Sequence, residues 1–227
     1  MGNKQRKRLP EKQSIFVRDF YPKTEKQEQL IDLIEKREVV IANGVPGSGK
    51  TFVTLATALN LLGGTYKKII LVKSVTTLPG EEIGFIKGGI EQKMEPTMMS
   101  FMWNIDKLCG QGSADALLDK KLIQVLPLAF IRGLSIDHSI VIVDEVQNID
   151  KHTFKTLMTR IGEDSKYIFL GDSEQVDRKN KKESCLNKIM EIFADNDIVG
   201  TIEFTDEDCV RNPIIPKILA ELRANDM

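Results

Sequence analysis

The stretch Gly44-Val45-Pro46-Gly47-Ser48-Gly49-Lys50-Thr51 matches the phosphate-binding loop pattern G-x-x-x-x-G-K-[ST]. The apolar residues 39–42 before it predict a buried strand, and residues 52–62 after it predict a helix packed on that strand. Glycines let the backbone turn sharply and point its N–H groups at an anion, where the start of the helix adds partial positive charge. A glycine-rich turn that merely resembles the motif would lack this strand-loop-helix order. The sequence therefore predicts a phosphate-binding site here.

The same loop supplies side chains suited to a nucleoside triphosphate and its magnesium ion. Lys50 can reach the β- and γ-phosphates, and the hydroxyl of Thr51 can ligate Mg²⁺. The residues expected to contact the nucleotide along this stretch are Gly44, Val45, Pro46, Gly47, Ser48, Gly49, Lys50, Thr51 and Phe52.

The composition is that of a soluble globular protein. The 227 residues allow one large α/β domain or two small ones, and they are 41% hydrophobic and 29% charged. Because 32 Lys and Arg oppose 33 Asp and Glu, the formal net charge of -1 gives no overall attraction for nucleic acid. Basic residues cluster in 4–12 and 178–182, either as solvated segments or as local contacts. We expect residues 1–16 to form a flexible basic tail and residues 17–227 to form a single domain.

The cysteines and the apolar runs indicate the cellular compartment in which the protein is expected to work. Cys109, Cys185 and Cys209 are far apart and odd in number, which fits neither a disulfide framework nor a zinc site. No apolar run is long enough to span a membrane, and no apolar secretion signal follows the basic N-terminus. We therefore expect a cytoplasmic protein with no membrane partner.

Short apolar runs alternate with helical patterns along the rest of the chain. Strands are expected at residues 39–42, 68–73, 122–126, 139–143, 167–170 and 201–204. Helices are expected after Thr24, at 52–62, at 90–108 with a break or kink near Pro96, and at 151–161, 185–193 and 214–222. This alternation predicts an α/β fold, a mostly parallel sheet with helices on both faces.

Two acidic residues directly follow the apolar strand at 139–143. We expect Asp144 to hold Mg²⁺ through its water shell, because a carboxylate at the end of such a strand does so in phosphate-loop proteins. Glu145 beside it can accept a proton from a water aligned on the γ-phosphate, so it is the expected general base. This pair indicates hydrolysis.

A second polar segment, Gly171-Asp172-Ser173-Glu174-Gln175, follows the strand at 167–170. Ligands bind outside the carboxyl ends of parallel strands, so this loop should face the same crevice. Gln175 can then hydrogen-bond the γ-phosphate or the attacking water and sense whether that phosphate is present. The alternative is a tight turn in which Asp172 caps the next segment.

Gln27 also has two interpretations. It lies three residues after Thr24 and completes the pattern of a capping box at a helix start. Its amide also offers a donor and an acceptor together, which is what the edge of adenine requires.

Three motifs together resemble the PhoH family: residues 44–51, Val143-Asp144-Glu145-Val146-Gln147-Asn148 and Gly171-Asp172-Ser173-Glu174-Gln175-Val176-Asp177. Segments 80–85, 127–133 and 159–162 are similar to the segments between these motifs, and the likeness runs in order from about Phe20 to the C-terminus. The resemblance implies a cytoplasmic ATPase with one RecA-like domain, related to the first motor domain of superfamily 1 helicases. Members are associated with phosphate starvation and can form hexameric rings, and those with an attached PIN nuclease domain unwind and cleave RNA.

The resemblance also implies roles for single residues. Gln27 resembles the helicase Q motif, which contacts adenine, and Lys73-Ser74 lies where helicases contact the nucleic-acid backbone. Arg211 resembles the arginine that reaches the γ-phosphate, a role for which Arg132 and Arg160 compete. The alternative for all three arginines is an ion pair or an interface.

We therefore expect a Mg²⁺-dependent ATP hydrolase that acts on single-stranded nucleic acid, RNA more than DNA, as a ring oligomer, hexameric by resemblance. Its expected catalytic residues are Lys50, Glu145, Gln175 and Arg211. Two alternatives stay open, a small-molecule phosphate-loop kinase and a nucleotide-controlled binding protein with little hydrolysis.

Overall fold

The sheet is open and parallel. The computed structural model describes residues 17–73, 90–131, 133–175, 185–212 and 214–225. In these parts of the chain, six strands pair in parallel in the order β3-β2-β4-β5-β1-β6. This confirms the predicted α/β sheet, whereas the expected tail at residues 1–16 and the basic cluster at 178–182 lie outside the described residues. The strands are β1 (Val39–Gly44), β2 (Lys68–Lys73), β3 (Ile123–Val125), β4 (Ser139–Asp144), β5 (Lys166–Gly171) and β6 (Val199–Phe204).

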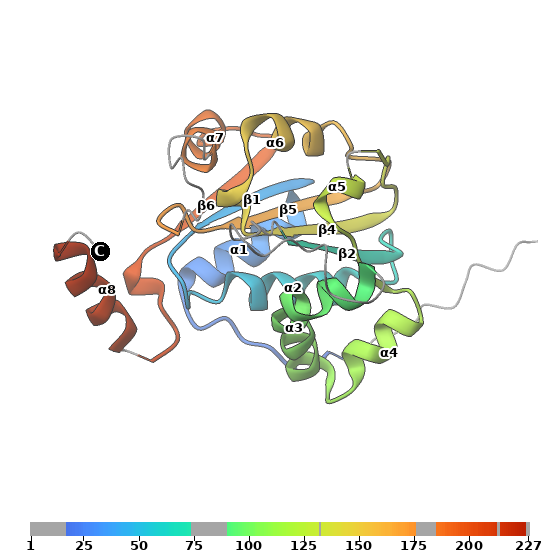
Figure 1. Cartoon of the computed structure of the whole chain (residues 1–227), viewed down its shortest axis with the longest axis horizontal. Helices are drawn as coiled ribbons and strands as arrows, with labels where there is room; N and C mark the ends of the chain where they lie inside the picture. The colour runs from blue at the N-terminus through green and yellow to red at the C-terminus, as the bar shows by residue number, and fades with distance from the viewer. Residues whose placement is uncertain (1–16, 74–89, 132, 176–184, 213, 226–227) are drawn as a thin grey trace, which may run out of the picture.

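Helices cover both faces of this sheet (Figure 1). Four of them pack on one face: α1 (Glu25–Lys36), α2 (Lys50–Leu61), α3 (Ile90–Cys109) and α4 (Ser113–Asp119). Three pack on the other face: α5 (Leu128–Ile131), α6 (Lys151–Met158) and α7 (Leu186–Phe193).

Alternate residues of β1 enter the two cores. Val40 and Ala42 pack in the core that contains α1 and α2, and Val39 and Ile41 pack in the core on the opposite face. Every residue of β1 and of β5 is buried. This two-sided burial explains why these strands are continuous apolar runs without alternation.

Four helices differ from the expected pattern in ways that matter here. α4 and α5 have no counterpart among the predictions, because 7 and 4 residues are too few for a helical period to be recognised. α6 ends at Met158, short of the expected residue 161. Of the break or kink expected near Pro96, the break is wrong, since α3 continues through that position. We attribute this to the buried residues Phe101 and Ile105, whose packing offsets the one hydrogen bond that a proline removes.

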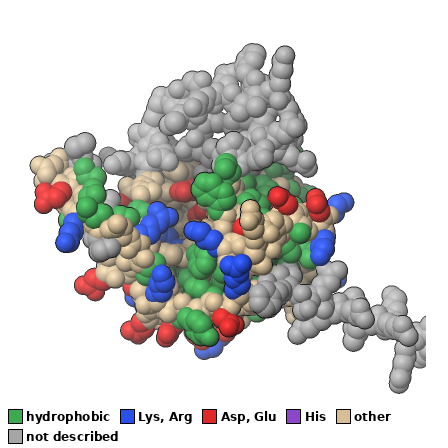
Figure 2. Space-filling view, turned by 90° about the horizontal axis from the view of Figure 1, so that it is seen from below, with side chains coloured by type: hydrophobic (Ala, Val, Ile, Leu, Met, Phe, Trp, Pro, Cys, Tyr) green, Lys and Arg blue, Asp and Glu red, His purple; other side chains and the backbone are tan. Residues whose placement is uncertain are grey.

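The last helix, α8 (Ile214–Ala224), stands apart from the two layers, at the left of Figure 1. Ile214, Ile218 and Leu222 follow one another at helical spacing and are exposed. Figure 2 shows hydrophobic side chains between charged ones at this end of the molecule. In the described part of the chain, no helix combines the length and apolar character needed to cross a membrane.

The strand register brings the predicted motifs to one edge of the sheet. Asn43 of β1 lies opposite Gly171 at the end of β5, and Lys73 at the end of β2 lies opposite Asp144 at the end of β4. Because all of these strands run in the same direction, the segments that follow them emerge side by side.

Candidate active site

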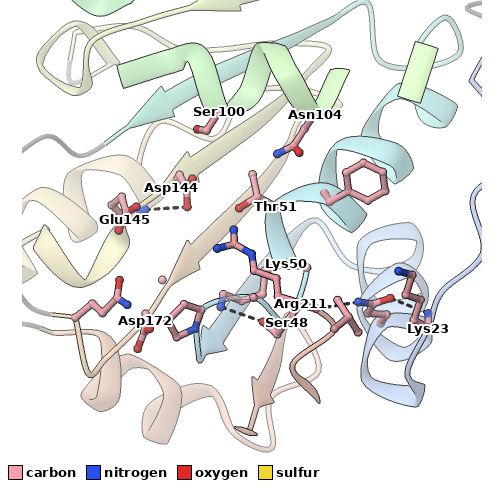
Figure 3. Close-up of a pocket in the computed structure, with 18 of the residues that line it drawn as sticks. Lys23, Ser48, Lys50, Thr51, Ser100, Asn104, Asp144, Glu145, Asp172 and Arg211 are labelled. Atoms are coloured by element: carbon pink, nitrogen blue, oxygen red, sulfur yellow. Dashed lines mark hydrogen bonds between the residues drawn. The ribbon is translucent and has the colours of Figure 1, made fainter. Parts of the chain in front are cut away.

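A cavity of about 650 Å³ opens at this edge of the sheet. Figure 3 shows Lys50 and Thr51 from the start of α2, and Asp144 and Glu145 from the end of β4, at this cavity. The sequence-predicted residues that line it are Gln27, Pro46, Gly47, Ser48, Gly49, Lys50, Thr51, Phe52, Asp144, Glu145, Gln175 and Arg211. The structure thus brings nearly all of the predicted site together.

Gly44 and Val45 are the exceptions, since they do not belong to the cavity lining. Gly44 has a φ of 140°, and a Cβ atom there would lie 2.2 Å from the carbonyl oxygen of Phe204 in β6. Only glycine permits this close approach. Gly44 therefore acts through the backbone path at the start of the loop and not as part of the cavity lining.

Lys50 is held at the centre of the loop. Its Nζ donates hydrogen bonds to the carbonyl oxygens of Gly44 at 2.6 Å and Val45 at 2.9 Å, and to Ser48 Oγ at 3.2 Å. Burial lowers the pKa of Lys50, against the opposing effect of the carboxylates of Asp172, Asp144 and Glu145. A cation placed among carbonyl oxygens and carboxylates can turn to phosphate oxygens when an anion enters the cavity.

In the acidic pair, Glu145 has an unusual backbone conformation and Asp144 has a raised pKa. Glu145 has a φ of 59°, in the left-handed region that residues other than glycine rarely occupy, and such strain gathers at functional sites. Its Oε1 lies 3.7 Å from Lys73 Nζ. Burial, and then the charge of Glu145, raise the pKa of Asp144 to about 6. Ionising Asp144 in this environment costs free energy, and a cation placed next to it would stabilise the ionised form.

The donor set fits Mg²⁺. Thr51 offers a hydroxyl and Asp144 a carboxylate, which are ligands that this ion prefers. Asp172 also lines the cavity, and its buried Oδ2 has no hydrogen-bond partner among the described residues. Among the described residues, no group of three or more His, Cys, Asp and Glu side chains forms a metal site. Magnesium in nucleotide sites needs only one or two protein ligands, since phosphate and water supply the others.

Gln27 joins α1 to the loop. Its Oε1 accepts a hydrogen bond from the backbone N–H of Lys23 at 2.8 Å, and its Nε2 donates to the carbonyl oxygen of Ser48 at 2.8 Å. Thr24 caps α1 by accepting from the backbone N–H of Gln27 at 3.2 Å. The reciprocal bond of a capping box, to the backbone N–H of Thr24, is replaced by the bond from Lys23. One amide proton and one lone pair remain for a ligand.

Two of the three candidate arginines, Arg211 and Arg160, lie at opposite edges of the sheet. Arg211 lines the cavity, and a Cβ atom on Gly47 would lie 3.0 Å from its Cδ. Arg160 lies at the opposite edge, where its carbonyl oxygen accepts from the hydroxyl of Tyr167 near the start of β5. Arg132, like Ser74, lies outside the described residues.

Several cavity residues were missed by sequence reasoning. Ser100, Asn104 and Lys107 reach the cavity from α3, where only their helical spacing within an apolar pattern could have indicated a shared face. Phe20 contributes from before α1, and its ring meets Phe52 edge to face at 5.5 Å between centroids. The residues that hold the loop after β5, namely Asn43 and Gln147, were also missed.

The sequence matches the model of a family described as PhoH-like protein over residues 19–223. A PhoH-like protein of Bacillus subtilis is 31% identical over 198 residues, which are 87% of this chain and 62% of the relative. Protein PhoH of Escherichia coli is 29% identical over 199 residues, 87% of this chain and 56% of the relative. The chain thus spans between 43% and 62% of the length of these and other curated relatives that it matches.

Solved structures show partial similarity. The large terminase of a thermophilic bacteriophage in complex with ADP has a TM-score of 0.48 and 12% identity, with 87% of this chain and 49% of that chain covered. Bacteroides sp Pif1 in complex with ADP-AlF4 has a TM-score of 0.45 and 16% identity, with 92% and 47% covered.

The raised pKa of Asp144 predicts how stability depends on pH. An acid with a higher pKa in the folded than in the unfolded state contributes stability at low pH that is lost as pH rises through the folded value, about 6. In metal-free buffer, we expect Asp144→Asn to raise the free energy of unfolding by roughly 1–2 kcal/mol at pH 7.5 and to change it little at pH 4. Urea denaturation at both pH values measures this, and an equal effect at both would contradict it.

Proposed function

The chain belongs to the PhoH-like protein family, and on this premise we propose that it is a Mg²⁺-dependent ATPase. The observation that carries the proposal is that the phosphate-binding loop, the acidic pair and Gln175 line one cavity. A triphosphate in this cavity would be bound by the loop N–H groups and by Lys50. Magnesium, held by Thr51 and Asp144, would neutralise charge on the phosphates.

Glu145 is the proposed general base. It accepts a proton from a water molecule whose oxygen attacks the γ-phosphorus, while the bond from that phosphorus to the bridging oxygen of ADP breaks. The products are ADP and inorganic phosphate. We favour hydrolysis over transfer to a small-molecule acceptor, because the acidic pair and Gln175 line one cavity and are residue types suited to the activation of water.

Single-stranded nucleic acid, RNA more than DNA, is the proposed partner. Lys73 supports this proposal, because it lies at the cavity lining and faces Glu145. A phosphate of the nucleic acid that attracts Lys73 away from Glu145 would leave this carboxylate free to act on water. The partner would then stimulate turnover through the base itself.

Two substitutions test the hydrolase. We expect Glu145→Gln to retain ATP binding and to lower kcat by about 10²–10⁴-fold, and Lys50→Ala to lose ATP binding. Phosphate release from Mg²⁺-ATP without an acceptor, together with equilibrium ATP binding, measures both effects. Lys188→Ala and Glu191→Gln are matched controls, because these residues form an exposed pair on α7. Absence of phosphate release by the unaltered protein would exclude the hydrolase and leave the kinase or the binding protein.

The nucleic-acid partner predicts a salt dependence. We expect single-stranded RNA to stimulate phosphate release at low salt and to lose most of this effect at high salt, because phosphate contacts release counterions. Lys73→Met should abolish most of the stimulation, with Lys188→Met as the control for loss of a lysine. Stimulation that persists at high salt and in Lys73→Met would contradict this contact, and a parallel series with DNA compares the two nucleic acids.

We also propose a ring oligomer, hexameric by family resemblance, in which Arg211 serves its own subunit. The support for action within one subunit is that Arg211 lines the cavity of its own chain. We expect Arg211→Ala to lower kcat by about 10³-fold, and mixing it with Glu145→Gln subunits to restore nothing. Recovery in the mixture would show that the arginine acts on a neighbour, and light scattering that finds only monomers would exclude the ring.

A further inference from the structure

Gln147 lies in the short 3-10 turn (Val146–Asn148) that follows the acidic pair. Its side chain is buried, with 1% of the residue exposed. The Nε2 atom donates to Glu145 Oε2 at 2.7 Å and to the carbonyl oxygen of Gln175 at 3.1 Å, and the Oε1 atom accepts from the backbone N–H of Asp172 at 3.0 Å. One side chain therefore connects the proposed base with both ends of the segment Asp172–Gln175, which directly follows β5.

The orientation of this amide follows from its partners. The N–H of Asp172 can only donate, so it must face the oxygen of the amide. The carbonyl of Gln175 can only accept, and the carboxylate of Glu145 accepts in this structure, so both face the nitrogen, whose two protons serve one each. The three bonds are thus compatible only in the arrangement observed.

The end of β5 leaves room for this side chain. A Cβ atom on Gly171 would lie 3.1 Å from Gln147 Oε1 and 3.3 Å from the backbone nitrogen of Gln147. It would also lie 2.7 Å from the Cδ2 of Leu186. The absence of a side chain at position 171 therefore lets Gln147 reach the N–H of Asp172.

Glu145 depends on such a partner, because its backbone alone does not aim its carboxylate. Its φ of 59° turns the chain at the start of the 3-10 turn, and its Oε1 lies 3.7 Å from Lys73 Nζ. The 2.7 Å bond from Gln147 is the shorter of the two side-chain interactions and acts on the other oxygen. It restricts rotation of the carboxylate, which a base aligned on a water requires.

We propose that Gln147 is a positioning residue, which aims Glu145 and couples it to the γ-phosphate sensor Gln175. The inference rests on the proposed hydrolysis. A movement of Gln175 toward a γ-phosphate shifts its carbonyl oxygen, and because Glu145 and this carbonyl share one NH₂ group, the shift changes the bond that holds Glu145. The base is thereby aimed when the terminal phosphate is present.

Gln147→Met tests the role of the amide, because it keeps much of the shape and removes all three hydrogen bonds. We expect kcat to fall at least 30-fold while the dissociation constant for Mg²⁺-ATP changes less than threefold. Gln147→Glu keeps the acceptor oxygen for Asp172 but loses the donor to Glu145, and it should lower kcat as far. Gln29→Met on α1 is the matched control, since this glutamine is exposed and its side chain bonds to Glu25 in its own helix. Thermal unfolding identifies any variant that does not fold.

A double-mutant cycle separates positioning from general structural support. If Gln147 acts through Glu145, then Gln147→Met in the Glu145→Gln background produces no further loss in single-turnover hydrolysis, because residues that act as a unit are non-additive. A further loss of the full single-mutant size would overturn the inference. So would an unchanged kcat in Gln147→Met and Gln147→Glu while Glu145→Gln is inactive, and the hydrolase would then stand. Undiminished turnover in Glu145→Gln would instead reject the proposed base together with this inference.

Discussion

The parallel hydrogen bonding of β1 between β5 and β6 is the constraint on which the site depends. In the register of this pairing, Asn43 lies opposite Gly171. The segment after β1 and the segment after β5 therefore leave the sheet at the same edge. The side chain of Asn43 joins them further, because its Oδ1 accepts from the backbone N–H of Ser173 at 3.0 Å. Without this register, the phosphate-binding loop would have no acidic partner within reach.

Charge balance is the second feature of the cavity. Lys50 is half-buried against its own loop, and the carboxylates of Asp172, Asp144 and Glu145 act on it. Burial raises the pKa of both Asp144 and Asp172, so the cavity holds acidic groups that are costly to ionise. A polyanion bound together with a divalent cation would pair with both kinds of group, the anion with Lys50 and the cation with the carboxylates. This explains why a lysine and several acidic residues can line the same cavity.

Local patterns predicted much of the fold and of the site. Continuous apolar runs predicted β1, β4 and β5, because strands buried on both faces need no polar alternation. The break expected at Pro96 was wrong because tertiary packing outweighs one lost hydrogen bond. Polar residues on α3, such as Asn104, could not be assigned to the cavity from the sequence, because the local sequence does not show which face of a helix packs against a distant loop.

By itself, the sequence determined the phosphate-binding loop, the acidic pair and the positions of the strands, because glycine geometry, strand apolarity and side-chain chemistry are local properties. Only the tertiary structure decided which of Arg211 and Arg160 reaches the cavity, since that depends on which edge of the sheet each one meets. It also decided the role of Gln147. Its partners Glu145, Asp172 and Gln175 come together only when β4 and β5 pair, because hydrogen bonds between distant segments depend on distances that the order of residues does not state.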